Sequence, residues 1–147
     1  MDEQSPNIIG LSSDHAGYDL KEKIKAELLK KNIKFEDLGA YSKESVDYPD
    51  YGKLLGEAIF RKEFKYGIAI CGSGIGISIA LNRVRGVRAA LCYDIEMARL
   101  ARQHNDANVI VFGARFINYE TAINLLDVFD KEKFEGGRHI PRVNKLG

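Results

Sequence analysis

The sequence predicts a doubly wound α/β fold, in which a parallel β-sheet of five strands lies between two layers of helices. Short apolar runs alternate with segments of helical periodicity along all 147 residues, and no internal repeat or linker interrupts the alternation. Strands that alternate with helices pair in parallel and need helices on both faces of the sheet. Hydrophobic residues make up 45% of the chain, enough for the core of one domain. We therefore expect a single three-layer αβα sandwich over residues 1–147.

Each predicted strand is a short apolar run bounded by polar residues or glycine. Such a run fits a strand that is buried on both faces of a sheet. Gly39 ends the second run, and Gly72 follows the third. In chain order the predicted strands are residues 7–12, 34–38, 66–71, 87–93 and 108–112.

The predicted helices have apolar side chains three and four residues apart, the spacing of one helix face. The first three span residues 18–31, 51–61 and 75–84, and Asp94 is a suitable N-cap for the fourth. On the first helix we expect Lys21, Glu22 and Lys25 to face solvent. Outside the third helix, the apolar stripes are Leu20, Ile24 and Leu28; Leu54, Leu55, Ala58 and Ile59; Met97, Leu100 and Ala101; and Ala122, Leu125, Leu126 and Phe129. This alternation is Rossmann-like.

Composition and charge exclude several classes of function. The 22 Lys and Arg residues nearly balance the 21 Asp and Glu residues, so we expect neither nucleic acid nor an acidic membrane as a partner. The acidic, polar start MDEQSPNIIG does not resemble a signal peptide, and no apolar run is long enough to span a membrane. Cys71 and Cys92 form no disulfide-rich pattern, and Cys92 lies within an apolar run as a packing residue. We therefore expect a reduced, cytoplasmic protein.

Polar segments follow several of the predicted strands. Asp14 and His15 follow the first strand, Asp47 and Tyr48 lie in the loop after the second, and Arg115 follows the fifth. Ligands of such folds bind beyond the carboxyl ends of the strands, so one end of the sheet is predicted to carry a site. Asp14 also suits a helix N-cap, and Arg115 suits either a phosphate contact or an exposed surface charge.

The loop CGSGIG at residues 71–76 is the most informative segment. Its glycines let the backbone turn sharply, and the helix that follows points free N–H groups back at the loop. This arrangement stabilises an anion and favours the thiolate form of a cysteine at the same place.

Four interpretations of this loop stay open on the residues alone. It is a structural turn with a buried cysteine, or a dinucleotide site. A dinucleotide site needs a glycine at the last position of G-x-G-x-x-G, and Ile77 occupies that position here. Asp94 nevertheless lies where a ribose-binding acid would be expected. The third interpretation is the active site of a cysteine hydrolase with His104 as partner. The fourth is a site for proton transfer on an anionic, enolisable substrate.

His104 and Asn105 belong to a polar cluster that ends the fourth predicted helix. A histidine there either complements the helix dipole or forms the edge of a site. The helix runs antiparallel to the strands, so its end lies at the opposite end of the sheet from Cys71. A symmetric dimer would bring His104 of one chain to Cys71 of another, so we expect a site shared between subunits.

The tail over residues 131–147 is polar and basic and contains the run GGRHIPR. Arg138 and Arg142 suit phosphate, because guanidinium groups bind phosphate oxygens in pairs; the alternative is a solvated tail. No group of His, Cys, Asp and Glu residues has the spacing of metal ligands, so no metal is expected.

Five motifs stand in order along the chain: SSDHAG, DYPDYG, ICGSGIGISIALN, RQHNDANVIVFGAR and EGGRHIPRV. Together they resemble the ribose-5-phosphate isomerase B family, also called the lactose-operon sugar isomerase family, over residues 8–143. The resemblance implies interconversion of ribose 5-phosphate and ribulose 5-phosphate through a cis-enediolate, without metal or cofactor. It also implies homodimers with active sites between subunits, with a dimer of dimers as a further arrangement.

The resemblance implies a role for each motif residue. Cys71 would move the proton between C1 and C2, with Ser73 as proton donor or hydrogen-bond partner, and His104 would open the sugar ring. A branch of the family that lacks the cysteine uses a glutamate, but the matching residue here is Ile77. The implied binding residues are Gly72, Gly74 and Gly76 for the enediolate oxygen; Asp14, Asp47, Tyr48 and Asn105 for the sugar; and His15, Arg115, Arg138 and Arg142 for the phosphate.

Two alternatives to this function stay open. Related members of the family act on six-carbon sugar phosphates such as allose or galactose 6-phosphate. A protein of another class, a non-catalytic module that binds nucleotides or sugar phosphates, would also use the glycine loop.

Overall fold

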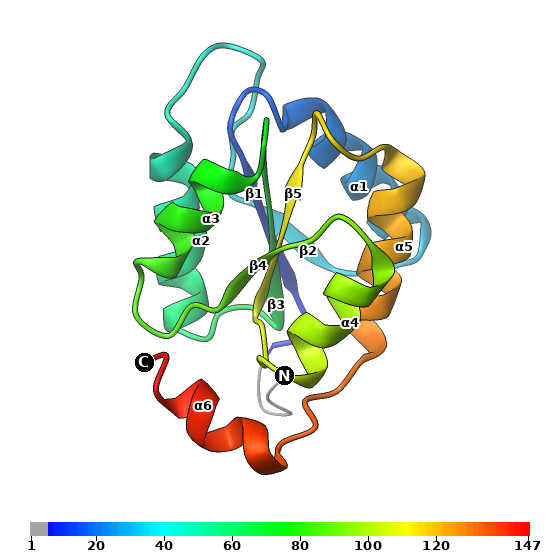
Figure 1. Cartoon of the computed structure of the whole chain (residues 1–147). Coiled ribbons are helices and arrows are strands. Elements are labelled where there is room, and N and C mark those ends of the chain that lie inside the picture. The colour runs from blue at the N-terminus through cyan, green and yellow to red at the C-terminus, as the bar shows by residue number, and fades with distance from the viewer. Residues whose placement is uncertain (1–5) are drawn as a thin grey trace.

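The computed structural model describes residues 6–147 and has the predicted three-layer αβα architecture (Figure 1). Residues 1–5, part of the start in which we expect no signal peptide, lie outside the described residues. In chain order the elements are β1 (Ile9–Ser13), α1 (Tyr18–Lys30), β2 (Phe35–Asp37), α2 (Tyr48–Phe60), β3 (Tyr66–Cys71), α3 (Ile75–Asn82), β4 (Ala89–Leu91), α4 (Ile95–Gln103), β5 (Val109–Gly113), α5 (Tyr119–Lys131), the 3-10 helix η1 (Gly137–His139) and α6 (Ile140–Asn144).

The sheet is parallel throughout and has the strand order β2-β1-β3-β5-β4. β5 lies between β3 and β4, with Ile110 in register with Ile68 on one side and with Ala90 on the other. β4 is shorter than the predicted 87–93, because it lies at the edge and pairs over three residues with β5.

The sheet separates two hydrophobic clusters. Helices α1, α4 and α5 pack on one face of the sheet, and α2 and α3 pack on the other (Figure 1). Alternate residues of β5 point to opposite faces, so Ile110 and Phe112 join the first cluster whereas Val109 and Val111 join the second. All four side chains are fully buried. This double-sided burial explains why the strand sequences are continuously apolar.

Two predicted helix features differ from the structure. Helix α2 begins at Tyr48 and not at residue 51, because Pro49 fits the first helical turn, where a missing N–H leaves no hydrogen bond unmade. The apolar stripes are also narrower than predicted. Leu54 and Met97 are exposed, at 49% and 38%, whereas Leu55 is fully buried.

Lys21 corrects the prediction that this face of the first helix is solvent surface. Its side chain is fully buried, and its ammonium donates to Asp37 Oδ1 at 2.5 Å and to the Ala40 carbonyl at 2.6 Å. Lys25 is partly buried and donates to Asp37 Oδ2 at 2.8 Å. The prediction was wrong for Lys21 because helix periodicity does not reveal a charge partner that a different element supplies.

The C-terminal tail folds into η1 and α6 after an extended segment. It lies across the end of the sheet at which the strands begin, next to the end of α4 (Figure 1). The tail is therefore neither a free solvated extension nor part of the edge that carries the glycine loop.

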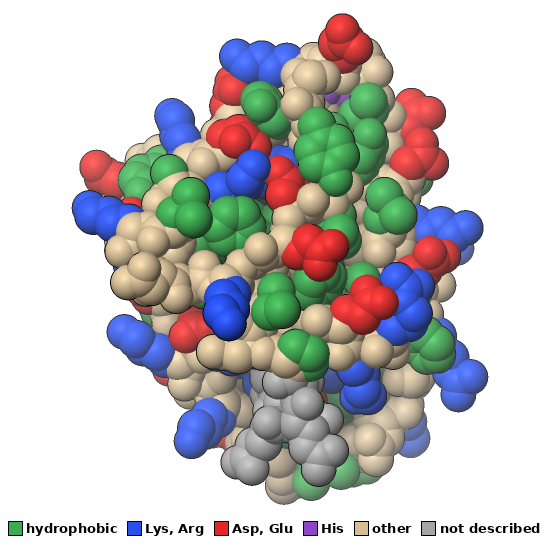
Figure 2. Space-filling view, turned by 180° about the vertical axis from the view of Figure 1, so that it is seen from behind, with side chains coloured by type: hydrophobic (Ala, Val, Ile, Leu, Met, Phe, Trp, Pro, Cys, Tyr) green, Lys and Arg blue, Asp and Glu red, His purple; other side chains and the backbone are tan. Residues whose placement is uncertain are grey.

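The surface carries both signs of charge. On the face shown in Figure 2, acidic and basic side chains are intermixed, in keeping with the near-equal totals of the sequence. Within residues 6–147, no helix is both long enough and apolar enough to cross a membrane.

Candidate active site

The glycine loop joins β3 to α3 and places Cys71 at the start of that helix. The Gly74 N–H donates to Cys71 Sγ at 3.1 Å, and the Ile75 N–H donates to Ser73 Oγ at 3.1 Å. Gly74 has a φ of +79°, the left-handed conformation that glycine adopts without strain. An N–H group that donates to a sulfur stabilises negative charge on it. The loop therefore supplies both a thiol and backbone donors at one point.

Two side chains from other segments cover the loop closely. The Tyr48 ring packs against Gly76, where an added methyl group would lie 2.5 Å from the ring atoms. The Arg115 guanidinium packs against Gly72, where an added methyl group would lie 3.0 Å from Cζ. The backbone N–H of Arg115 also donates to the Gly72 carbonyl at 3.0 Å. The structure thus brings a phenol and a guanidinium to the loop that carries the thiol.

The loops after β1 and β2 meet at the same end of the sheet. Asp14 accepts a hydrogen bond from the Gly17 N–H at 3.0 Å, but the N-cap residue of α1 is Gly17, so Asp14 closes the turn before the helix and does not have the capping role that the sequence suggested. His15 Nδ1 accepts from the Val46 N–H at 3.1 Å, which leaves the ring proton on Nε2. Val46 directly precedes Asp47, the exposed N-cap residue of α2. His15 therefore ties the first loop to the segment that carries Asp47 and Tyr48.

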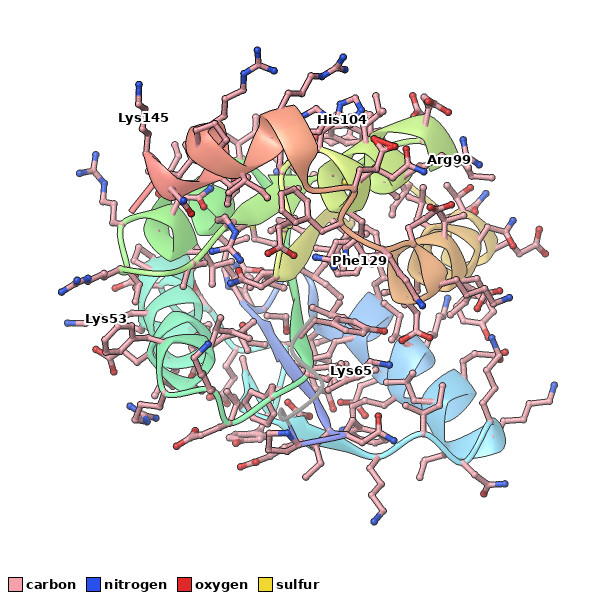
Figure 3. The ribbon with its side chains drawn as sticks, turned by 90° about the horizontal axis from the view of Figure 1, so that it is seen from below. Lys53, Lys65, Arg99, His104, Phe129 and Lys145 are labelled. Carbon is pink, nitrogen blue, oxygen red and sulfur yellow. The ribbon has the colours of Figure 1, made fainter. Side chains whose placement is uncertain are left out.

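The predicted site residues fall into two groups within one chain. Asp14, His15, Asp47, Tyr48, residues 71–76 and Arg115 lie at the carboxyl end of the sheet. The second group lies at the opposite end, where α4 ends and the tail packs, and it comprises His104, Asn105, Arg138 and Arg142. Figure 3 shows His104 beside the C-terminal helical segment. The topological argument that His104 does not reach Cys71 in the same chain is confirmed.

His104 has two neighbours that the sequence did not predict. Its Nε2 lies 3.5 Å from Glu135 Oε1, and its ring stacks on His139 with centroids 4.3 Å apart. Burial, followed by repulsion from His104 and Arg138, lowers the pKa of His139 below its usual value. The His residue inside the GGRHIPR motif was the available signal, but nothing in the spacing linked it to His104.

The same contacts bear on the expectation that no metal is bound. The ligand atoms of His104, Glu135 and His139 lie within 4.8 Å of one another. Glu135 and His139 are four residues apart, but His104 lies about 30 residues earlier at the end of α4, so the spacing along the chain does not reveal the group of three.

Comparisons with known proteins place these features in context. The family model described as ribose/galactose isomerase matches residues 9–146. The chain is 41% identical over 138 residues to ribose-5-phosphate isomerase B of Escherichia coli, covering 94% of this chain and 93% of the relative. Among solved structures, it is similar to a ribose 5-phosphate isomerase of Thermotoga maritima, with a TM-score of 0.93, 52% identity and coverage of 95% and 96% of the two chains. It is also similar to ribose-5-phosphate isomerase B of Mycoplasma genitalium with bound ribulose-5-phosphate, with a TM-score of 0.88, 40% identity and coverage of 95% and 93%.

Proposed function

Because this chain belongs to the ribose/galactose isomerase family, we propose that it interconverts ribose 5-phosphate and ribulose 5-phosphate through a cis-enediolate. The observation that carries the proposal is the Cys71 thiol at the start of α3, with the Gly74 N–H 3.1 Å from its sulfur. Relatives with the matching name, and the ribulose-5-phosphate bound to the Mycoplasma genitalium protein, support this choice of substrate.

The proposed proton transfer uses Cys71 as the base. Its thiolate removes the proton from C2 of the open-chain aldose, and the electron pair of that C–H bond forms the double bond of the enediolate. The thiol then returns the proton to C1, while O1 gains a proton and O2 loses one to become the ketone. Ser73, whose Oγ lies at the same loop, would serve as proton donor or hydrogen-bond partner for these oxygens.

The glycine loop would hold the charge that develops on the enediolate oxygen. The backbone N–H groups between Gly72 and Gly76 lie at the start of α3, whose dipole also favours an anion there. The Tyr93 hydroxyl donates to the Ser73 carbonyl at 2.9 Å and holds the loop in position. Donors fixed in advance need no reorganisation during the reaction, and losing one typically costs about 10²–10³ in rate.

A second copy of the chain would complete the site. His104 would open the furanose ring, Asn105 would hold sugar oxygens, and Arg138 and Arg142 would join the first copy's His15 and Arg115 around the phosphate. Asp14, Asp47 and Tyr48 would border the sugar. Binding energy from the phosphate would hold the reacting carbons in place.

Helix α3 offers support for a covering partner. Ile75 and Ile79 lie on this helix next to the glycine loop and are 54% and 53% exposed. Apolar side chains beside a site are a common feature of surfaces that another subunit covers. We therefore propose a homodimer with shared active sites, with a dimer of dimers as a further arrangement.

An assay of ribose 5-phosphate conversion in the presence of EDTA tests this function. Cys71→Ala should remain folded by circular dichroism and lose about 10²–10⁴ in turnover, the usual contribution of a positioned acid or base. Cys92→Ala is the matched control, since Cys92 is buried elsewhere in the sheet region, and it should keep its activity.

Other outcomes would redirect the proposal. Activity on allose or galactose 6-phosphate without activity on ribose 5-phosphate would favour the six-carbon alternative. Tight NAD binding with no turnover on any sugar phosphate would favour a binding module. A folded Cys71→Ala variant with most of its activity would move the base to another residue.

A further inference from the structure

We propose that His104, Glu135 and His139 form a binding site for Zn²⁺, and that a bound ion withdraws His104 from ring opening. Two imidazoles and one carboxylate are a common ligand set of catalytic zinc sites, in which a fourth position stays open. The binding itself is independent of the proposed function. The inhibition rests on the proposed role of His104.

The distances between the three side chains suit a small ion. His104 Nε2 lies 3.5 Å from Glu135 Oε1, and His139 Nε2 lies 3.9 Å from the same oxygen. A tetrahedral zinc ion with bonds of about 2.0–2.1 Å holds its ligand atoms about 3.3 Å apart. The first pair is already close to that separation, and the second, at 3.9 Å, must close by about 0.6 Å. The two imidazoles now stack, with planes 15° apart, and an imidazole binds a metal in the plane of its ring, so both rings must tilt out of the stack to direct their nitrogens at one ion.

The surrounding structure holds these ligands in one place. The Glu135 N–H donates to the Gln103 carbonyl at 3.0 Å, which fixes the extended segment against the end of α4. The Gln103 amide donates to Glu132 Oε2 at 2.8 Å and adds a second link between the same segments. The His139 side chain is 9% exposed, whereas that of His104 is 34% exposed. The site is therefore anchored on one side and open to an entering ion on the other.

The ligand types favour zinc over the harder cations. Imidazole nitrogen suits Zn²⁺, Cu²⁺ and Ni²⁺, whereas Mg²⁺ and Ca²⁺ prefer sites built wholly from oxygen. Arg138 and Arg142 oppose a dication, but both are exposed and their charge is screened by solvent. The Glu135 carboxylate supplies a negative charge directly at the ion.

Calorimetric titration of the full chain with Zn²⁺, after stripping with EDTA, tests the binding. We expect one ion per chain, and at least about tenfold weaker binding in Glu135→Gln and in His139→Gln. The control is His15→Gln, which removes the histidine at the other end of the sheet and should bind Zn²⁺ like the wild type. Co²⁺ in place of Zn²⁺ should give the intense visible absorption of a tetrahedral site in the wild type and lose it in His139→Gln. Equal affinity in the wild type and both ligand variants would overturn the site, as would no binding at all.

Turnover with and without Zn²⁺ tests the inhibition separately. In the wild type, Zn²⁺ should lower turnover about tenfold or more, and EDTA should restore it. Each variant is compared with its own activity without metal, and His139→Gln should be much less sensitive. Inhibition of equal size in His139→Gln would mean that the ion acts elsewhere, for example at Cys71, and would overturn the proposed control of His104. A protein that binds Zn²⁺ but isomerises no sugar phosphate would contradict the proposed function and leave the metal site standing.

Discussion

The two cysteines differ in their immediate surroundings. Cys71 lies at a helix start and accepts a hydrogen bond from a backbone N–H. Cys92 is 1% exposed, and its Sγ donates to the Ala90 carbonyl at 3.6 Å. Burial, with the charge of Asp94 adding to it, raises the pKa of Cys92 to about 12. At pH 8 only about 10⁻⁴ of that thiol would be ionised.

We predict that iodoacetamide at pH 8 alkylates Cys71 in the native protein and spares Cys92. The reactive species is the thiolate, and burial beside Asp94 suppresses it at Cys92, whereas Cys71 lies at a helix start in the glycine loop. Peptide mass spectrometry after timed labelling measures both rates. Labelling in concentrated urea is the control, because unfolding should make the two thiols similar. Equal native rates would contradict the prediction.

Residue types indicated one half of the candidate site more completely than the other. Asp14 and Arg115 come just after strands, Cys71 ends a strand, and Tyr48 lies beyond the loop after another, so the rule that ligands bind beyond the carboxyl ends of strands placed them together. Glu135 was missed, because it acts on His104 through a fold of the tail that no periodicity predicts. Its contact depends on an extended segment that returns to the end of α4.

At the scale of elements, the Lys21–Asp37 pair joins α1 to β2. Burial works against the charge of Asp37, but hydrogen bonds from Lys21, Lys25 and the Gly39 N–H outweigh it and hold the pKa of Asp37 below its usual value. A carboxyl with a lowered pKa in the folded state stabilises the fold at pH values above its unfolded pKa. That stability is lost as the pH falls through the folded pKa.

We predict that Asp37→Asn lowers the free energy of unfolding at pH 7 by about 3–5 kcal/mol, because it leaves the buried Lys21 ammonium without its carboxylate. Urea unfolding at pH 7 and at pH 3 measures the effect. The difference from the wild type should shrink at pH 3, because Asp37 of the unfolded wild type takes up a proton below its usual pKa of about 3.9 and the unfolded state is thereby favoured. Glu36→Gln, an exposed change on the same strand, should stay within about 0.5 kcal/mol at both pH values. A variant as stable as the wild type at pH 7 would refute this role of the pair.

The order and type of the main elements were predictable because each has a strong local pattern. β3 and β5 are continuously apolar, and α1 and α5 repeat apolar residues at helical spacing. Element ends were less predictable, since they depend on neighbours. β4 shortens where it meets β5 at the edge, and the 3-10 helix of the tail lies where His139 packs on His104.

At the scale of the whole molecule, the candidate site is divided between the two ends of one sheet. Cys71 lies at the end of β3, whereas His104 caps the far end of α4. No side-chain movement spans a sheet. Two copies related by a two-fold axis would form two complete sites, each with Cys71 from one chain and His104 from the other.

We predict that two inactive variants restore activity when their subunits are mixed. Cys71→Ala and His104→Ala, each nearly inactive alone, should give about a quarter of the wild-type activity after random exchange. Half of the dimers would then contain one subunit of each variant, and one of the two sites in each such dimer would be intact. Mild denaturation followed by refolding of the mixture provides the exchange, and the isomerase assay measures the recovery. Cys71→Ala mixed with the double variant should recover nothing. No recovery from the first mixture would show that each site uses one chain alone.

The place of β5 in the sheet affects the growing chain on the ribosome. β4 is translated before β5, yet in the finished sheet it is attached to β3 through β5. The roughly 20 residues between β4 and the end of β5 take about one to four seconds to synthesise at typical rates. During that interval the edge of β3 that will pair with β5 is unpaired, and β4 has no strand to pair with. The nascent chain therefore passes through a period in which protection by a chaperone would matter more than at any later stage of its synthesis.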